Sequence, residues 1–185
     1  MQLVILFLTG NTGKLQEVQA MLPDIVAWPV DLPEIQSDNA RAIIEAKLRE
    51  AAKLKPDCPL MVEDTSLYLD ALGGLPGPLI KWFIAKDSLG LTGLFELAKA
   101  RAKLTAKAST WIGLYQHGDL RFFEGSISGQ IVSPRGDQGF GWDPIFVPDG
   151  SSHSFAEMSP AEKARYSMRS LALEQLKTHL AASSG

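Results

Sequence analysis

An apolar run at residues 3–8 is followed at once by a glycine-containing turn and then by apolar residues at helical spacing. A short continuous run of this kind, with β-branched Val4 and Ile5 in it, is typical of a strand buried on both faces, as in the central strands of α/β sheets. The run therefore predicts a strand at 3–8, a turn and a helix. A second strand is expected over 26–30.

The chain has 185 residues, 45% of them apolar, so one domain with a real core is expected over 1–185. Apolar residues recur at helical spacing over 39–54, 91–101 and 171–180. β-Forming residues cluster over 59–62, 108–115 and 120–132. This order predicts an α/β fold with a mixed sheet flanked by helices. Residues 181–185 have nothing to bury and are expected to fray.

The charge balance and the cysteine content exclude several classes of protein. With 18 basic and 21 acidic side chains the formal charge is -3, which argues against a chain that binds nucleic acid through its net field and favours a small-molecule partner. The run at 3–8 is far shorter than the roughly 20 residues of a membrane span. The single Cys58 has no partner for a disulfide. We therefore expect a cytoplasmic protein that binds neither nucleic acid nor membranes.

The segment from Thr9 to Lys14 joins the first strand to a helix N-terminus. Unpaired backbone N–H groups and the helix dipole favour an anion there, and Lys14 adds a positive charge. The segment is not a Walker A loop, because Leu15 follows the lysine, and it is not the dinucleotide fingerprint either. A phosphate site and a plain tight turn both fit this pattern.

Three carboxylates form a candidate metal site. Glu63 and Asp64 follow the apolar stretch 59–62, where we expect the strand to end, and Glu34 lies in a loop flanked by prolines. Mg²⁺ suits one or two such carboxylates, with water and substrate phosphate oxygens as its other ligands. The three histidines are scattered, so zinc is not indicated. The adjacent acidic pair also fits a solvated strand end or a helix cap.

Residues 139–144 place Phe140 and Trp142 among glycines and beside Asp143. A glycine-framed ring can stack on a flat base, and the carboxylate can accept hydrogen bonds from it. The two rings could instead pack into the core beneath a loop. Taken with the phosphate loop and the acidic pair, the segment indicates a nucleoside phosphate bound with Mg²⁺. No serine or cysteine has a plausible histidine base, so direct attack by water on phosphorus is expected.

Five segments, in order, resemble the inosine triphosphate pyrophosphatase family, which is Ham1-like and acts on noncanonical purine nucleotides: 9–14, 62–65, 71–83, 139–144 and 155–169. The Glu-Asp-Thr and Lys-Trp-Phe triplets are more similar to the eukaryotic-type branch. The resemblance implies an elongated mixed sheet with the active site in a cleft between two lobes. It also implies a homodimeric enzyme that uses Mg²⁺, or Mn²⁺, to hydrolyse ITP, dITP and XTP to the monophosphate and pyrophosphate.

The resemblance further implies roles for single residues. Glu34 and Asp64 would hold the metal, and Asp64 or Glu63 would orient or deprotonate the attacking water. Phe140 would stack on the base, and Arg169 would lie near the purine 6-oxo group. The full set of implied substrate contacts is Thr9, Gly10, Asn11, Thr12, Gly13, Lys14, Lys47, Asp64, Thr65, Phe140, Gly141, Trp142, Asp143, Lys163, Met168 and Arg169. Lys47 could otherwise run along the helix surface with its ammonium in water.

Met168 departs from the family pattern, because it stands where the family typically has histidine in a Ser-His-Arg triplet. If that histidine contacts the base through its side chain, methionine loses a hydrogen bond and discrimination against ATP should relax. If the main chain makes the contact, little changes. A pyrophosphatase for another nucleotide, such as dUTP or one with a methylated base, and a nucleotide sensor without turnover remain alternatives.

Overall fold

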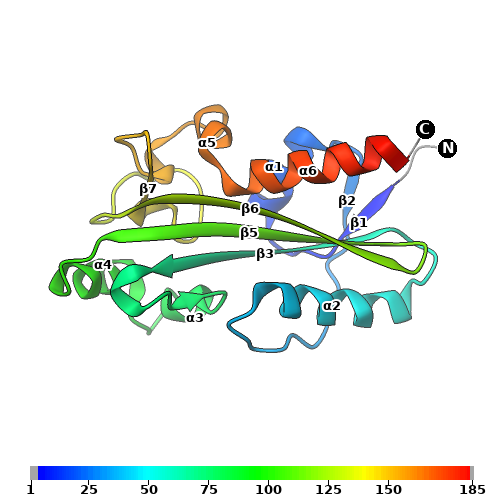
Figure 1. The fold of residues 1–185 in the computed structure, drawn as a ribbon, viewed down its shortest axis with the longest axis horizontal. Coiled ribbons are helices and arrows are strands. Elements are labelled where there is room, and N and C mark those ends of the chain that lie inside the picture. The colour runs from blue at the N-terminus through cyan, green and yellow to red at the C-terminus, as the bar shows by residue number, and fades with distance from the viewer. Residues whose placement is uncertain (1–3, 184–185) are drawn as a thin grey trace. The chain divides into compact units, whose positions relative to one another are not determined.

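The computed structural model describes residues 4–183 and has the alternation of strands and helices expected of an α/β protein (Figure 1). Its strands are β1 Ile5–Phe7, β2 Ile25–Ala27, β3 Leu60–Leu69, β4 Pro76–Gly77, β5 Thr105–Gln116, β6 Asp119–Ile131 and β7 Phe146–Pro148. Its helices are α1 Thr12–Met21, α2 Ala40–Leu54, α3 Ile80–Phe83, α4 Gly90–Ala100, α5 Pro160–Tyr166 and α6 Met168–Ser183. Short 3-10 turns occur at η1 Asp70–Leu72, η2 Asp143–Ile145 and η3 Phe155–Glu157.

The seven strands form one sheet in the order β2-β1-β3-β5-β6-β7, and β4 pairs with β3. β1 is parallel to β2 and β3, with Ile5 opposite Ile25 and Leu6 opposite Leu60. β4 and β7 are antiparallel to their neighbours β3 and β6. The predicted mixed sheet with flanking helices is therefore confirmed.

The chain divides into two compact units. Unit 1 holds the chain up to Asp64, the segment Thr110–Gly125 and the chain from Arg169 on, and unit 2 holds Thr65–Ser109 and Ser126–Met168. β3, β5 and β6 each contribute residues to both units. The expected single domain and the expected cleft stay predictions.

The core of unit 1 has two apolar clusters, one on each face of its strands. α1 and α6 cover one face, where Val18 and Leu173 pack with Ile5 and Met61, and α2 covers the other (Figure 1). On the α2 face, a Cβ atom added to Gly113 of β5 would lie 2.7 Å from Leu48 and closer still to Ile44. The missing side chain at this strand position is what lets α2 pack against the sheet.

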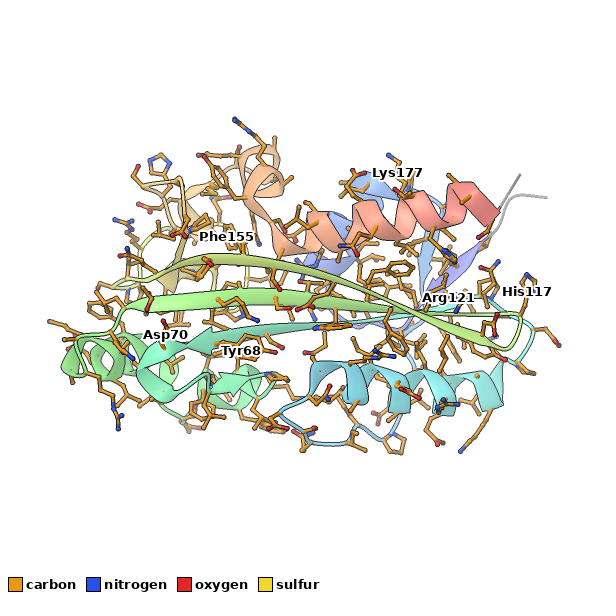
Figure 2. All side chains as sticks on the ribbon, in the orientation of Figure 1. Tyr68, Asp70, His117, Arg121, Phe155 and Lys177 are labelled. Carbon is orange, nitrogen blue, oxygen red and sulfur yellow. The ribbon has the colours of Figure 1, made fainter. Side chains whose placement is uncertain are left out.

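The core of unit 2 is centred on three aromatic rings. The Trp142 ring meets the Phe146 ring edge to face, with their centroids 5.5 Å apart and the planes at 79°. The Phe146 and Phe155 centroids are 5.4 Å apart, and Figure 2 marks Phe155. Leu94 of α4 belongs to the same cluster.

Several boundaries differ from those expected from the sequence. The strand expected at 26–30 is β2 Ile25–Ala27, and two other differences affect β3 and α6. β3 does not end at residue 62 but continues to Leu69, so Glu63 and Asp64 lie within a strand and not at its end. The prediction of a strand end was wrong, because Ser66 and Leu67 are fully buried and continue the strand pairing through a polar stretch of sequence. Residues 181–183 continue α6, and residues 184 and 185, like residue 3 of the first apolar run, lie outside the described part of the chain.

The helices expected at 39–54, 91–101 and 171–180 and the strands expected at 108–115 and 120–132 are present as α2, α4, α6, β5 and β6. β5 and β6 are sheet neighbours joined at His117 and Gly118, which both have positive φ, and Figure 2 marks His117 at this turn. α5 begins after the N-cap Ser159, whose Oγ accepts a hydrogen bond from the Glu162 backbone N–H at 3.2 Å. None of the helices described between residues 4 and 183 is both long enough and apolar enough to cross a membrane.

The replacement Gly113→Ala should lower the free energy of unfolding by about 1–3 kcal/mol, because the added methyl group overpacks the contact with α2. Urea unfolding followed by circular dichroism measures the change. Gly10→Ala is the matched control, since no heavy atom lies within 4 Å of a Cβ atom added there. Equal stability of Gly113→Ala and the unchanged protein would contradict the packing described here.

Candidate active site

The loop between β1 and α1 has the geometry expected of an anion site. Asn11 caps α1, and its Oδ1 accepts a hydrogen bond from the Lys14 backbone N–H at 3.0 Å. The Asn11 backbone N–H donates to Thr9 Oγ1 at 3.1 Å. Gly10 is exposed with open space around it, so packing within the protein does not explain its missing side chain. The loop follows the carboxyl end of a central parallel strand, the usual place for ligands in α/β sheets.

A buried charge cluster lies next to this loop in unit 1. The Glu63 side chain has 0% exposure, and its two oxygens accept hydrogen bonds from Arg169 Nε at 2.5 Å and Nη2 at 3.1 Å. Lys14 Nζ lies 3.1 Å from Glu63 Oε1, and Glu17 pairs with Arg169 Nη1. A buried charge is tolerated only when it is paired and hydrogen-bonded, which this arrangement achieves for both Glu63 and Arg169.

The Arg169 guanidinium stays charged in this setting. Burial alone would lower its pKa, but the negative charge of Glu63, the hydrogen bonds to Glu63 and the charge of Glu17 outweigh that effect and raise the pKa above its ordinary value. The guanidinium is 2% exposed and bound to two carboxylates. This geometry fits a structural ion pair, and contact with a purine oxo group stays a prediction.

The two adjacent carboxylates, Glu63 and Asp64, differ in their exposure. The oxygens of Glu63 are held by a guanidinium and an ammonium, and its side chain is shielded from solvent. Asp64 is half-buried in β3. Asp64 is thus the more accessible of the two to solvent, and which of them acts on water stays a prediction.

Glu34 and Lys47, expected to bind metal and substrate, lie together in unit 1. Lys47 Nζ of α2 donates to Glu34 Oε2 at 2.9 Å, and both side chains are partly exposed. The lysine therefore does not run free along the helix surface. Within residues 4–183 there is no group of three or more His, Cys, Asp or Glu side chains that could hold a metal ion. Mg²⁺ needs only one or two carboxylates, because water and phosphate oxygens supply its other ligands, so Glu34 and Asp64 stay predicted ligands.

The segment expected to bind the base lies in unit 2. Asp143 Oδ2 accepts hydrogen bonds from Lys163 Nζ at 2.7 Å and from the Phe140 backbone N–H at 2.8 Å. The Lys163 ammonium also lies 4.6 Å from the centroid of the Phe140 ring. Gly139 and Gly141, both at positive φ, flank Phe140, which is half-buried. Phe140 is thus fixed in place while part of its surface stays exposed.

The side chains of Trp142 and Met168 take a different place from the one expected. Trp142 is 6% exposed and Met168 is 2% exposed, and both belong to the apolar cluster of unit 2. For Trp142 the alternative of a ring packed into the core is correct, so its indole offers no stacking face. Met168 presents no polar atom and contacts apolar neighbours. Any contact of either residue with a ligand would have to come from its backbone.

Sequence reasoning missed Glu17. This residue completes the charge cluster by pairing with Arg169, which is 152 positions away in the chain. Its spacing of three residues from Lys14 places both on one side of α1, but nothing in the local pattern distinguishes it from an ordinary surface glutamate.

Thr65, expected to contact substrate, is half-buried in β3.

A model of the Ham1 family matches residues 5–179 of the chain. The chain belongs to the Ham1 family. It is 41% identical over 182 residues to a protein of Schizosaccharomyces pombe named inosine triphosphate pyrophosphatase, and the match covers 95% of this chain and 94% of that one. It is 44% identical to inosine triphosphate pyrophosphatase 1 of Trypanosoma cruzi, covering 95% and 91%. A solved HAM1 protein of Coxiella burnetii superposes with a TM-score of 0.85 at 29% identity, covering 98% and 100%.

The replacement Glu63→Gln should lower the free energy of unfolding by about 3–5 kcal/mol, because it removes the charge that compensates the buried Arg169. Chemical denaturation measures this loss. Glu45→Gln is the matched control, since its pair with Arg49 is exposed and should contribute less than about 1 kcal/mol. Similar effects of the two replacements would show that Glu63 is not a buried ionic partner.

Proposed function

We propose that this Ham1-family protein hydrolyses ITP, dITP and XTP to the nucleoside monophosphate and pyrophosphate. The observation that carries the proposal is the near full-length identity of 41% and 44% with proteins named inosine triphosphate pyrophosphatase. The exposed loop at the N-terminus of α1, with Lys14 beside it, supports it because this geometry suits a polyphosphate. Removal of such nucleotides would cleanse the nucleotide pool.

Residues of unit 1 supply the phosphate and metal contacts in this proposal. Residues 9–14 bind phosphate oxygens through backbone N–H groups and the Lys14 ammonium. Glu34 and Asp64 would hold Mg²⁺, or Mn²⁺, which when bound neutralises charge on the phosphates. In the structure, Lys47 Nζ lies 2.9 Å from Glu34 Oε2. If Glu34 bound a metal ion instead, the Lys47 ammonium would be available to a phosphate oxygen.

The proposed reaction is a direct displacement by water. Asp64 orients a water molecule and accepts its proton while the water oxygen attacks the α-phosphorus. The bond between the α-phosphorus and the bridging oxygen breaks, and pyrophosphate leaves with that oxygen. Lys14 and Lys47 stabilise the negative charge that develops on the leaving group.

The base contacts in this proposal come from the segment at residues 139–143. Phe140 stacks on the purine, and Gly141 and Trp142 offer backbone groups to its edge. Asp143 and Lys163 hold each other at 2.7 Å and set the position of Phe140. We further propose that the enzyme is a cytoplasmic homodimer with no nucleic-acid or membrane partner. Exposed large apolar side chains, including the 56% exposed Trp82, are the kind of surface a second copy would cover.

The test is product analysis with Mg²⁺ over ITP, dITP, XTP, GTP, ATP and dUTP. Monophosphate and pyrophosphate, formed fastest from ITP or XTP, would support the proposal, and the ATP rate would report whether Met168 relaxes selectivity at all. Preference for dUTP would favour a related pyrophosphatase with another substrate. Binding without turnover would favour a sensor, and release of single phosphates would place the cleaved bond elsewhere.

The replacement Asp64→Asn should lower kcat by roughly 10²–10⁴-fold, because the amide cannot accept the proton of the attacking water. The steady-state rate with ITP, measured beside a thermal unfolding curve, separates lost chemistry from lost folding. Asp119→Asn, at an exposed position on β6, is the control that should leave the rate unchanged. Turnover of Asp64→Asn near that of the unchanged enzyme would exclude Asp64 as the base.

A further inference from the structure

The loop that carries Phe140 is tied to a second segment of unit 2, residues 152–157. The Gln138 backbone N–H donates to the Ala156 carbonyl at 2.9 Å. The Arg135 guanidinium donates through Nη2 to the Ser152 carbonyl at 2.6 Å. Ser154 Oγ donates to the Arg135 carbonyl at 2.9 Å, and the Ser154 side chain is fully buried. Each of the two segments therefore both donates hydrogen bonds to the other and accepts them from it.

Glu157 is the charged centre of this connection. Its Oε2 accepts a hydrogen bond from the Ser154 backbone N–H at 2.7 Å and pairs with Arg135 Nε at 2.9 Å. The Ser154 backbone hydrogen bond, opposed by partial burial and supported by the charge of Arg135, lowers the pKa of the Glu157 carboxyl. The ionised Glu157 carboxylate therefore links the η3 turn to Arg135, which begins the loop that carries Phe140.

The backbones of the two segments also touch. Gly136 has φ of +84°, and a Cβ atom added there would strike the Ala156 carbonyl and the Glu157 nitrogen. Side chains are excluded at this position, so the loop packs directly on the backbone of the second segment. Arg135 and Gln138, on either side of Gly136, make the hydrogen bonds that keep this contact closed.

The connection ends immediately before Phe140. Gln138 is bound to the second segment, Gly139 follows at φ of +75°, and the Phe140 backbone N–H is bound to Asp143. A displacement of residues 135–138 would therefore be transmitted to Phe140 through one residue. None of these contacts involves Glu34, Asp64 or the loop at residues 9–14.

We propose that Arg135 and Glu157 are positioning residues for binding of the purine base, acting through the loop that presents Phe140. The inference rests on the proposed function, because it takes Phe140 as the stacking ring. Its specific consequence is that the pair contributes to binding of ligands that contain the base and not to binding of a ligand that consists of phosphate alone.

The test compares inosine 5′-monophosphate with pyrophosphate, each titrated calorimetrically into the protein with Mg²⁺. Glu157→Gln keeps an acceptor for the Ser154 N–H but removes the charge opposite Arg135, and should raise the Kd for inosine monophosphate about tenfold. The Kd for pyrophosphate should not change. Arg135→Lys keeps the charge but loses the hydrogen bond to Ser152, and should give a smaller rise. Glu96→Gln, which removes an exposed pair with Lys99 on α4 of the same unit, is the control.

The Kd values of the two ligands distinguish failure of the positioning role from failure of the proposed function. If the unchanged protein binds neither ligand, the proposed function fails. If it binds both, and Glu157→Gln weakens both equally or neither, the positioning role is wrong while the function stands. If Glu157→Gln does not fold, the Arg135→Lys titration decides in the same way, and an unchanged Kd for inosine monophosphate would overturn the inference.

Discussion

The buried ion pair between Glu63 and Arg169 is the interaction on which the organisation of unit 1 depends. Glu63 projects from β3, Arg169 lies in the first turn of α6, and Lys14 and Glu17 bring α1 to the same carboxylate and guanidinium. Two charges removed from water cost more than their attraction returns unless further hydrogen bonds complete them. In this arrangement the four groups satisfy one another, and they tie the first two turns of α1, which follow the loop at residues 9–14, to β3 and α6.

Unit 2 also contains a buried ion pair, which has fewer members than the one in unit 1. Lys163 and Asp143 are both buried, and the ammonium also lies over the rings of Phe140 and Phe155 at 4.6 and 5.4 Å from their centroids. The rings and the carboxylate together replace the water that the ammonium loses. In each unit a buried charge pair therefore lies beside a loop that has open space around one glycine, Gly10 in one case and Gly141 in the other.

Local patterns in the sequence predicted much of the fold but little of the pairing. The strand, turn and helix at the start and the strands β5 and β6 follow from short-range periodicity and residue preference. The extension of β3 through Glu63 and Asp64 does not, because polar residues interrupt the apolar pattern where tertiary contacts continue the strand. Nor do the partners of Arg169, since ion pairs between residues 106 and 152 positions apart leave no periodic signal. The burial of the Trp142 ring was one of two alternatives that the sequence left open.

We propose that water attacks the α-phosphorus of a nucleoside triphosphate, and hydrolysis of ITP in ¹⁸O-enriched water is the decisive measurement. Mass spectrometry of the products shows which fragment carries the new oxygen. We expect the ¹⁸O label in inosine monophosphate and none in pyrophosphate. Label in pyrophosphate would show attack on the β-phosphorus and would contradict the roles given to Asp64 and to the loop at residues 9–14.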